Sequence, residues 1–224
     1  MLRISPNALA LPLTFVMAAC TPSWMDMTTD TAPAASSGSQ ASVRHNTAPK
    51  QALRITMTIK DAPGTFGWMR PIAHYDVVNR ECLSPPNDNA GGRSAPTPTA
   101  PTDFVLQPIG DGVYSGVVYA DLMKDEDYTG NGICRWALTS IVVQMKVTGV
   151  EGETLFVPNI PQHKLVTGET ETVYFNKIAY PRLESSELRE PISTGQSDRS
   201  RFGASIQDRD LFTVTFAIEE GAAE

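Results

Sequence analysis

The fold of this chain is decided by a stretch in which apolar and polar residues alternate, LRITMTIK at residues 53–60. Its odd-numbered residues are apolar and its even-numbered residues are polar. Successive side chains of a β-strand point to opposite faces of a sheet, so this alternation predicts a strand with one face on a core and the other in water. The stretch FTVTFAI at residues 212–218 has a similar pattern near the other end of the chain.

Further strand candidates lie between these two stretches, separated by turns rich in Gly, Asn and Pro. The candidates are residues 72–83, 104–109, 112–122, 133–149, 154–157 and 172–180, and the turns are residues 110–112, 130–132, 149–152 and 158–161. The only helix that the sequence favours is a short one near residues 183–188. About seven or eight strands with almost no helix predict an all-β fold over residues 51–220, an antiparallel β-sandwich that is either Ig-like or an open barrel.

The first residues of the chain differ in composition from everything that follows. Arg3 supplies a positive charge, residues 8–18 are largely apolar, and two alanines precede Cys20. This order is typical of an export signal, and the apolar run is far shorter than the roughly 20 residues that span a bilayer. We therefore expect residues 1–19 to be a cleaved signal peptide.

Residues 17–20, Met-Ala-Ala-Cys, resemble the lipobox of bacterial lipoproteins, with Met17 where leucine is usual. The resemblance implies that Cys20 carries acyl chains such as palmitate, which anchor the chain in a membrane. Thr21 follows where an aspartate would favour the inner membrane, so the resemblance implies a periplasm-facing lipoprotein of the outer membrane. The alternative is an ordinary cleaved signal in which Cys20 is incidental.

The two remaining cysteines are Cys82 and Cys134. An even pair in an exported chain predicts a disulfide, and the alternative is two separate buried thiols.

Ahead of the first strand, residues 20–50 are rich in Thr, Ala, Ser, Pro and Gly and lack periodicity. Such a composition buries too little apolar area to offset chain entropy, which predicts a disordered tether.

The most distinctive segment of the sequence is DEDYTGNG at residues 125–132. Asp125, Asp127 and Thr129 place oxygen ligands at alternate positions, as in the opening half of an EF-hand, which makes them a calcium candidate. Trp136 stands where a bidentate glutamate would close an EF-hand. The alternative is an acidic loop between two strands, in which the glycines supply positive φ angles.

The same segment continues to a cysteine and a tryptophan, and residues 125–136 as a whole have a DxDYxGxGxCxW-like pattern. This pattern resembles a motif of uncharacterised exported proteobacterial lipoproteins, some of which look like immunity partners of secreted toxins. The resemblance implies a role in binding another protein.

Composition and motifs disfavour nucleic-acid binding and catalysis. The chain has 18 Lys and Arg residues against 25 Asp and Glu residues, a formal net charge of −7, which repels phosphate backbones. The histidines His45, His74 and His163 are isolated, and residues 112–116 miss the spacing of a nucleophile elbow by one position. We therefore expect neither an enzyme nor a cofactor, although the paired carboxylates of a hydrolase can escape motif analysis.

These observations favour a membrane-anchored protein-binding module, and in its sharpest form an immunity or inhibitor protein against a secreted toxin or lytic enzyme. The alternatives are an assembly lipoprotein of an envelope complex and, third, a hydrolase without a recognisable motif. The candidate contact residues lie in two loops and are Asp125, Asp127, Tyr128, Asn131, Asp198, Arg199 and Arg201.

Overall fold

The computed structural model describes residues 43–83, 97–184 and 187–221. Residues 1–42, which hold the expected signal peptide, Cys20 and most of the expected tether, lie outside the described residues. Within the described part, no helix is long and apolar enough to cross a membrane.

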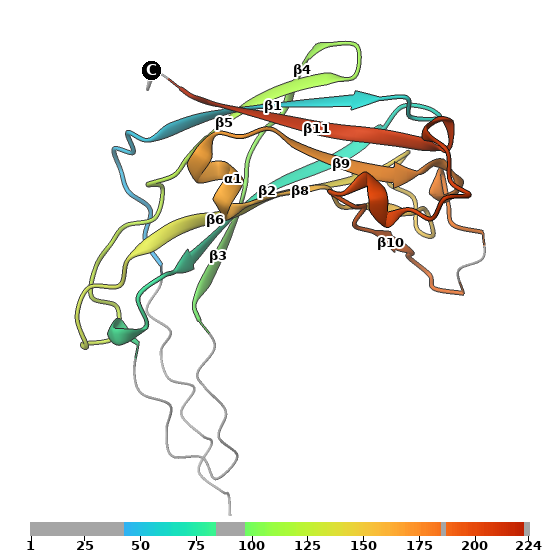
Figure 1. The fold of residues 1–224 in the computed structure, drawn as a ribbon. Coiled ribbons are helices and arrows are strands. Elements are labelled where there is room, and N and C mark those ends of the chain that lie inside the picture. The colour runs from blue at the N-terminus through green and yellow to red at the C-terminus, as the bar shows by residue number, and fades with distance from the viewer. Residues whose placement is uncertain (1–42, 84–96, 185–186, 222–224) are drawn as a thin grey trace, which may run out of the picture. The chain divides into compact units, whose positions relative to one another are not determined.

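The described part is an all-β sandwich of two sheets, which confirms the predicted fold class (Figure 1). The first sheet has the strand order β4 (Gln107–Gly110), β5 (Val113–Tyr119), β1 (Ala52–Lys60), β11 (Leu211–Glu220) and β9 (Glu171–Asn176). The second has the order β10 (Ile192–Ser193), β7 (Leu155–Phe156), β6 (Trp136–Lys146), β2 (Trp68–Val77) and β3 (Thr99–Asp103), and β8 (Asn159–Pro161) also pairs with β6. All pairs are antiparallel except β10 with β7.

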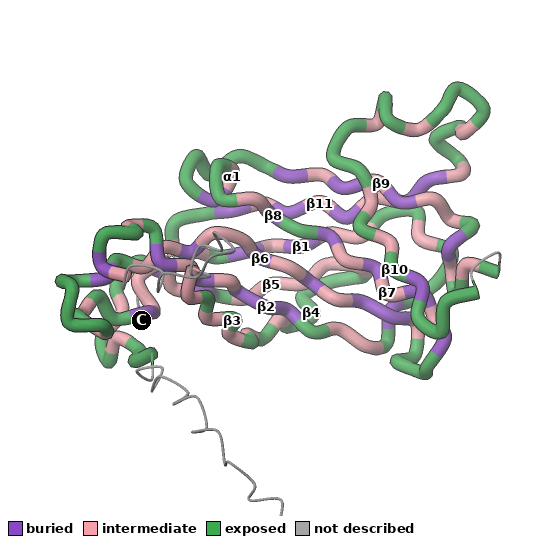
Figure 2. Tube along the Cα trace, turned by 90° about the horizontal axis from the view of Figure 1, so that it is seen from below, coloured by how far each residue is buried: buried purple, intermediate pink, exposed green. Residues whose placement is uncertain are grey.

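The period-two stretch at residues 53–60 forms β1 at the centre of the first sheet, and its odd positions face the core as predicted. Ile55 and Met57 have no exposed surface, and they pair with Ile218 and Phe216 of β11. Buried residues of both sheets form one cluster between them, whereas most loop residues at the two ends are exposed (Figure 2). Full burial of one such aliphatic or aromatic side chain stabilises the fold by about 1.5–3 kcal/mol.

Several of the predicted strands have different limits in the structure. Residues 104–109 are not one strand, because β3 ends at Asp103 in one sheet and β4 starts at Gln107 in the other. Residues 72–83 and 172–180 begin as strands but end in the 3-10 helices η1 (Arg80–Cys82) and η2 (Lys177–Ala179). In the second case the side chain of Asn176 accepts the N–H of Ile178 at 3.0 Å, which turns the chain out of the strand.

The helix predicted near residues 183–188 is wrong for its described residues, which are turn, bend or coil. The structure instead has α1 (Gln162–Thr167) directly after β8, where the sequence predicted only a turn at residues 158–161. Pro161 precedes the first turn of α1, and Gly168 ends it with φ at 69°, a left-handed value that glycine adopts without strain. Two further 3-10 helices are η3 (Arg199–Arg201) and η4 (Asp208–Asp210).

Residues 43–50, which we name the strap, lie against the loop that follows β5 and are part of the folded unit. The N–H of Asn46 donates to Leu122 O at 2.7 Å, and the N–H of Lys124 donates to Arg44 O at 2.9 Å. The carboxylate of Asp121 accepts the N–H groups of Lys50 and Gln51 at about 2.9 Å. These bonds extend the folded unit back to Arg44, ahead of residue 50, where the tether was predicted to end.

Candidate functional site

The sandwich has two ends, and the predicted contact residues divide between them. The loop that carries Asp125, Asp127, Tyr128 and Asn131 joins the end of β5 to the start of β6. The loop that carries Asp198, Arg199 and Arg201 leads into the start of β11. The start of β1 pairs with the end of β5 and with the end of β11, so the two loops lie at opposite ends of the strands. They do not form one surface (Figure 1).

The disulfide between Cys82 and Cys134 is present, as predicted, at the first of these ends. Its cysteines are buried in a small cluster with Val77, and Tyr128 and Trp136 pack against this cluster. The rings of Tyr128 and Trp136 meet edge to face at 6.2 Å. The tryptophan therefore lies beside the disulfide, and Tyr128 is a packing residue of this end.

The oxygens of the calcium candidate bind separate partners in the protein instead of converging. Asp125 accepts the N–H of Trp136 at 2.9 Å, and the Thr129 hydroxyl donates to Cys82 O. Asp127 accepts the N–H of Gly130 at 2.6 Å and that of Thr129 at 3.1 Å, and these bonds lower the pKa of its carboxyl. Within the described residues no three His, Cys, Asp or Glu side chains form a metal-binding group.

The strap is fastened to this loop by an ion pair. The Nε and Nη2 atoms of Arg44 each bind a carboxylate oxygen of Glu126 at 2.5 Å, and Lys124 Nζ lies 3.1 Å from the same carboxylate. The hydrogen bond from Arg44 is the main reason why the pKa of Glu126 is lowered. The Tyr128 hydroxyl donates to Lys124 O at 2.6 Å. This end of the domain is thus fixed by a covalent bond and by charged pairs.

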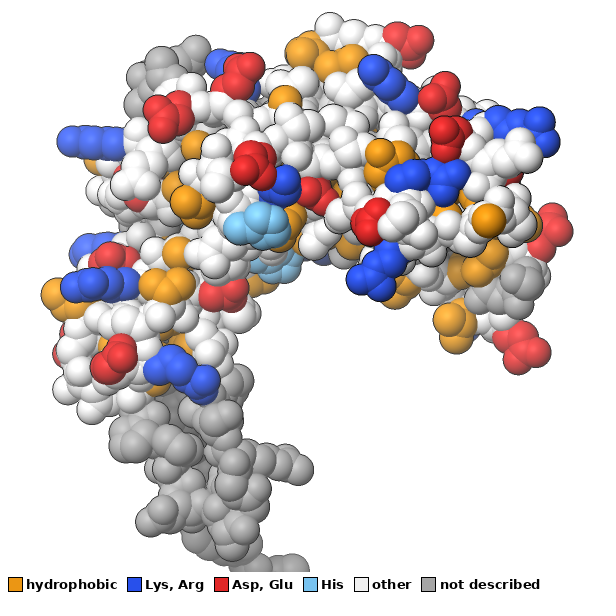
Figure 3. Space-filling view, viewed as in Figure 1, with side chains coloured by type: hydrophobic (Ala, Val, Ile, Leu, Met, Phe, Trp, Pro, Cys, Tyr) orange, Lys and Arg blue, Asp and Glu red, His pale blue; other side chains and the backbone are white. Residues whose placement is uncertain are grey.

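At the opposite end, the predicted contact residues organise their own loop. Asp198 accepts the hydroxyl of Ser200 at 2.7 Å and its N–H at 2.8 Å, which caps η3, and these two bonds lower the pKa of Asp198. Arg199 binds Asp208 at 2.7 Å and lies 5.9 Å from the ring centroid of Phe202. Arg201 is exposed. Figure 3 shows charged side chains of both signs dispersed over the visible face.

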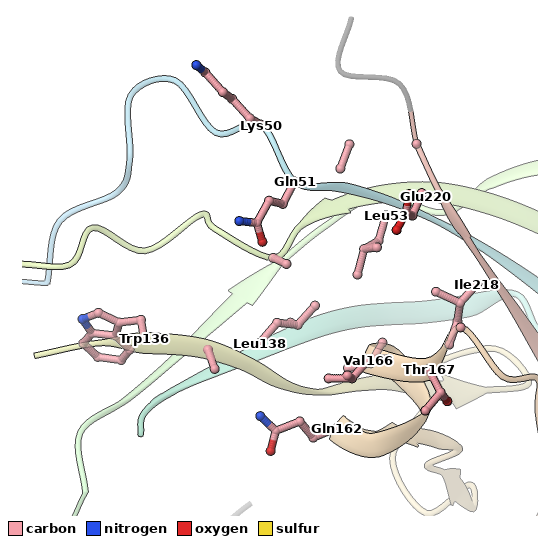
Figure 4. Close-up of a pocket in the computed structure, with 16 residues that line it drawn as sticks. Lys50, Gln51, Leu53, Trp136, Leu138, Gln162, Val166, Thr167, Ile218 and Glu220 are labelled. Atoms are coloured by element: carbon pink, nitrogen blue, oxygen red, sulfur yellow. The ribbon is translucent and has the colours of Figure 1, made fainter. Parts of the chain in front are cut away.

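Sequence analysis missed a pocket of about 790 Å³ at the disulfide end (Figure 4). Its apolar wall includes three buried side chains, Leu138, Leu165 and Ile218, which come from β6, α1 and β11. The full lining is Lys50, Gln51, Ala52, Leu53, Ala120, Trp136, Ala137, Leu138, Gln162, Leu165, Val166, Thr167, Gly168, Ile218, Glu220 and Gly221. These residues come from segments far apart in the chain, so no local sequence pattern announces them.

Figure 4 shows how the labelled side chains of the pocket lie. Leu53 of the first sheet and Leu138 of the second point toward each other across the cavity, and Val166 and Ile218 bound it on the side of α1. Gln51 points into the cavity, whereas the ammonium group of Lys50 points away from it. Trp136 lies on the side opposite α1.

No protein-family model, no curated protein and no solved structure matches this chain. The pocket therefore has to be interpreted from its own chemistry. Its lining contains no Ser, Cys, His or Asp residue, and its two charged residues are Lys50 and Glu220. Apolar walls with a few polar groups at the rim are typical of binding pockets.

The three histidines lie in different elements of the described structure. His45 is in the strap and pairs with Met123, His74 is in β2, and His163 is in α1. Ser115 of the near-miss elbow motif pairs with Thr56 inside a sheet, so it does not occupy the sharp turn that a nucleophile elbow needs.

Proposed function

We propose that this protein is a lipid-anchored lipoprotein of the outer membrane whose β-sandwich binds another protein in the periplasm. The observation that carries the binding role is the pocket of about 790 Å³, lined mainly by apolar and amide side chains. Such a lining removes apolar surface of a partner from water, and its few polar groups orient that partner.

The proposed anchor is Cys20, on the strength of the lipobox-like residues 17–20. The disulfide supports an oxidising compartment, because disulfides persist in the periplasm and are rare in the cytosol. The strap joins the fold at the pocket end, since Lys50 and Gln51 line the pocket.

The sharpest form of the proposal is an immunity or inhibitor protein. The chain is acidic, with a net charge of −7, and complementary charge accelerates encounter with a basic toxin or lytic enzyme. The resemblance of residues 125–136 to immunity-like lipoproteins adds to this. The alternative is an assembly role in an envelope complex, and the experiment below distinguishes it from the inhibitor role.

The experiment places a photoactivatable amino acid at Val166 in the full chain, in living cells. Val166 is 78% exposed on α1 and lines the pocket. Ile178 is 71% exposed in η2, at the opposite end of the sandwich, and is the matched control position. We expect a protein adduct from Val166 and none from Ile178.

Mass spectrometry of the adduct distinguishes the roles. A secreted hydrolase or toxin supports the inhibitor role, and a subunit of an envelope complex supports the assembly role. No protein adduct from Val166, or equal adducts from both positions, contradicts the binding role. The anchor is tested separately by labelling with palmitate, which Cys20→Ser should abolish.

A further inference from the structure

We propose that the pocket recognises an extended, neutral, aliphatic peptide segment of the partner protein. This proposal rests on the proposed function, because it names the chemistry of the partner that the binding role requires. Four features of the pocket end carry it: an aliphatic wall, an open strand edge, two free amides and the local charge.

The wall suits aliphatic side chains. Leu138, Leu165 and Ile218 are each at most 8% exposed and belong to both sheets and to α1. Leu53 completes the wall from β1. A branched aliphatic side chain that enters between them removes apolar surface of both molecules from water.

An open strand edge borders the same pocket. On one side β6 pairs with β2 from Trp136↔Val77 to Lys146↔Trp68, with a bulge at Thr139. On the other side the ladder with β8 ends at Ser140↔Pro161, so residues 137–139 have no strand neighbour there within the described part, whereas the N–H of Trp136 is bound by Asp125. An extended peptide can add main-chain hydrogen bonds to such an edge and place alternate side chains in a pocket.

Two side-chain amides are available at the rim. Gln51 and Gln162 both line the pocket, and neither amide has a hydrogen-bond partner among the described residues. Each amide offers one acceptor and two donors, which match the C=O and N–H groups of a peptide backbone.

Charge complementarity favours a neutral peptide over an anionic lipid. The lining has one cation, Lys50, whose ammonium group points away from the cavity, and one anion, Glu220. Glu171 lies close behind the wall, opposite Phe216 in the β9–β11 ladder; it is 5% exposed, and its Oε1 has no hydrogen-bond partner in the described part. The lining therefore has no excess of positive charge to offset a carboxylate or phosphate headgroup.

The test uses the full chain in detergent and fluorescein-labelled hexapeptides with blocked ends, followed by fluorescence anisotropy. One pool draws its four central residues from Ala, Val, Leu, Ile and Gln, and matched pools carry Asp or Lys at two of these positions. A fourth pool repeats the aliphatic one with N-methyl groups on alternate backbone amides. Fluorescent palmitate is the lipid probe.

We expect the aliphatic pool to bind, the charged pools to bind at least tenfold more weakly, and N-methylation to weaken binding about tenfold. The double variant Gln51→Ala/Gln162→Ala should weaken binding about tenfold through two lost hydrogen bonds, while Gln107→Ala on β4 leaves it unchanged. Gln107 is exposed on an edge strand and does not line the pocket.

Three results would overturn the inference: no binding of the aliphatic pool, equal binding of the N-methylated pool, or competition by palmitate at the same site. If any of these results is obtained while Val166 still gives a protein adduct in cells, the protein-binding role is supported and only the recognition of an aliphatic peptide is rejected. The absence of that adduct removes the binding role itself.

Discussion

The two ends of the sandwich are stabilised by different interactions. At one end the rings of Phe156, Phe175 and Phe212 pack with centroids 5.1–5.5 Å apart, and Phe66 and Tyr180 extend this group. At the other end a pocket separates the sheets, and the disulfide and the Arg44–Glu126 pair fix the surrounding segments. The first end is held by packing and the second by cross-links.

The difference shows where the fold can leave space for a ligand. A cavity in a packed interior costs stability, because the atoms that line it lose their contacts. The disulfide and the Arg44–Glu126 pair lie outside the pocket, so they can stabilise the segments around it without occupying its volume. The aromatic end can thus supply stability, while the other end has space for a ligand.

The largest expected effect comes from the aromatic end. Phe212→Ala should lower the free energy of unfolding by about 4 kcal/mol, since it leaves a cavity among packed rings. Leu138→Ala should cost only about 2 kcal/mol, because its side chain already borders an open pocket. Urea unfolding of both variants checks this order, and an equal loss would contradict the comparison.

The next effect belongs to the disulfide, which joins residues 52 positions apart. Cys82→Ala/Cys134→Ala should lower stability by about 2–4 kcal/mol, mainly by freeing the unfolded chain. Thermal unfolding of the oxidised protein and of the double variant measures the loss. An unchanged midpoint would show that this end does not depend on its cross-link.

Sequence analysis predicted the elements whose pattern is local and long. The alternation at residues 53–60 placed Ile55 and Met57 in the core correctly, and export context paired Cys82 with Cys134 correctly. The glycines of residues 130–132 have the positive φ angles that the loop interpretation required. The alternation and the glycines depend on the local backbone conformation. The disulfide depends on a pairing with few alternatives, because only two cysteines follow Cys20.

Sequence analysis failed where tertiary contacts decide. β8 has three residues and exists because it pairs with β6, so residues 158–161 read as a turn in isolation. The composition of the strap predicts a tether, because its pairing of Arg44 with Glu126, 82 positions away, is not visible in the local sequence. The pocket is assembled from separate strands and α1, and no spacing along the chain encodes it.

The smallest expected effect concerns the strap. The folded protein lowers the pKa of Glu126 below its ordinary value of 4.5, so the ion pair stabilises the fold above that pH and loses its contribution as the pH falls. We expect the strap to loosen as the pH falls below 4.5 and through the lowered pKa of Glu126, where the folded protein takes up the proton. The amide resonances of Asn46 and Lys124, which form the strap hydrogen bonds, report this in a pH titration by NMR.

Glu126→Gln should loosen the strap at neutral pH and remove most of this pH dependence. Glu169→Gln is the matched control, since Glu169 also has a lowered pKa through its pair with Lys164 but lies in another part of the fold. If Glu169→Gln shifts the strap resonances as strongly as Glu126→Gln, the loosening is a property of the whole domain. If the strap responds only to Glu126→Gln, the Arg44–Glu126 ion pair acts locally. It then also influences the pocket rim, because the strap leads directly into Lys50 and Gln51, which line the pocket.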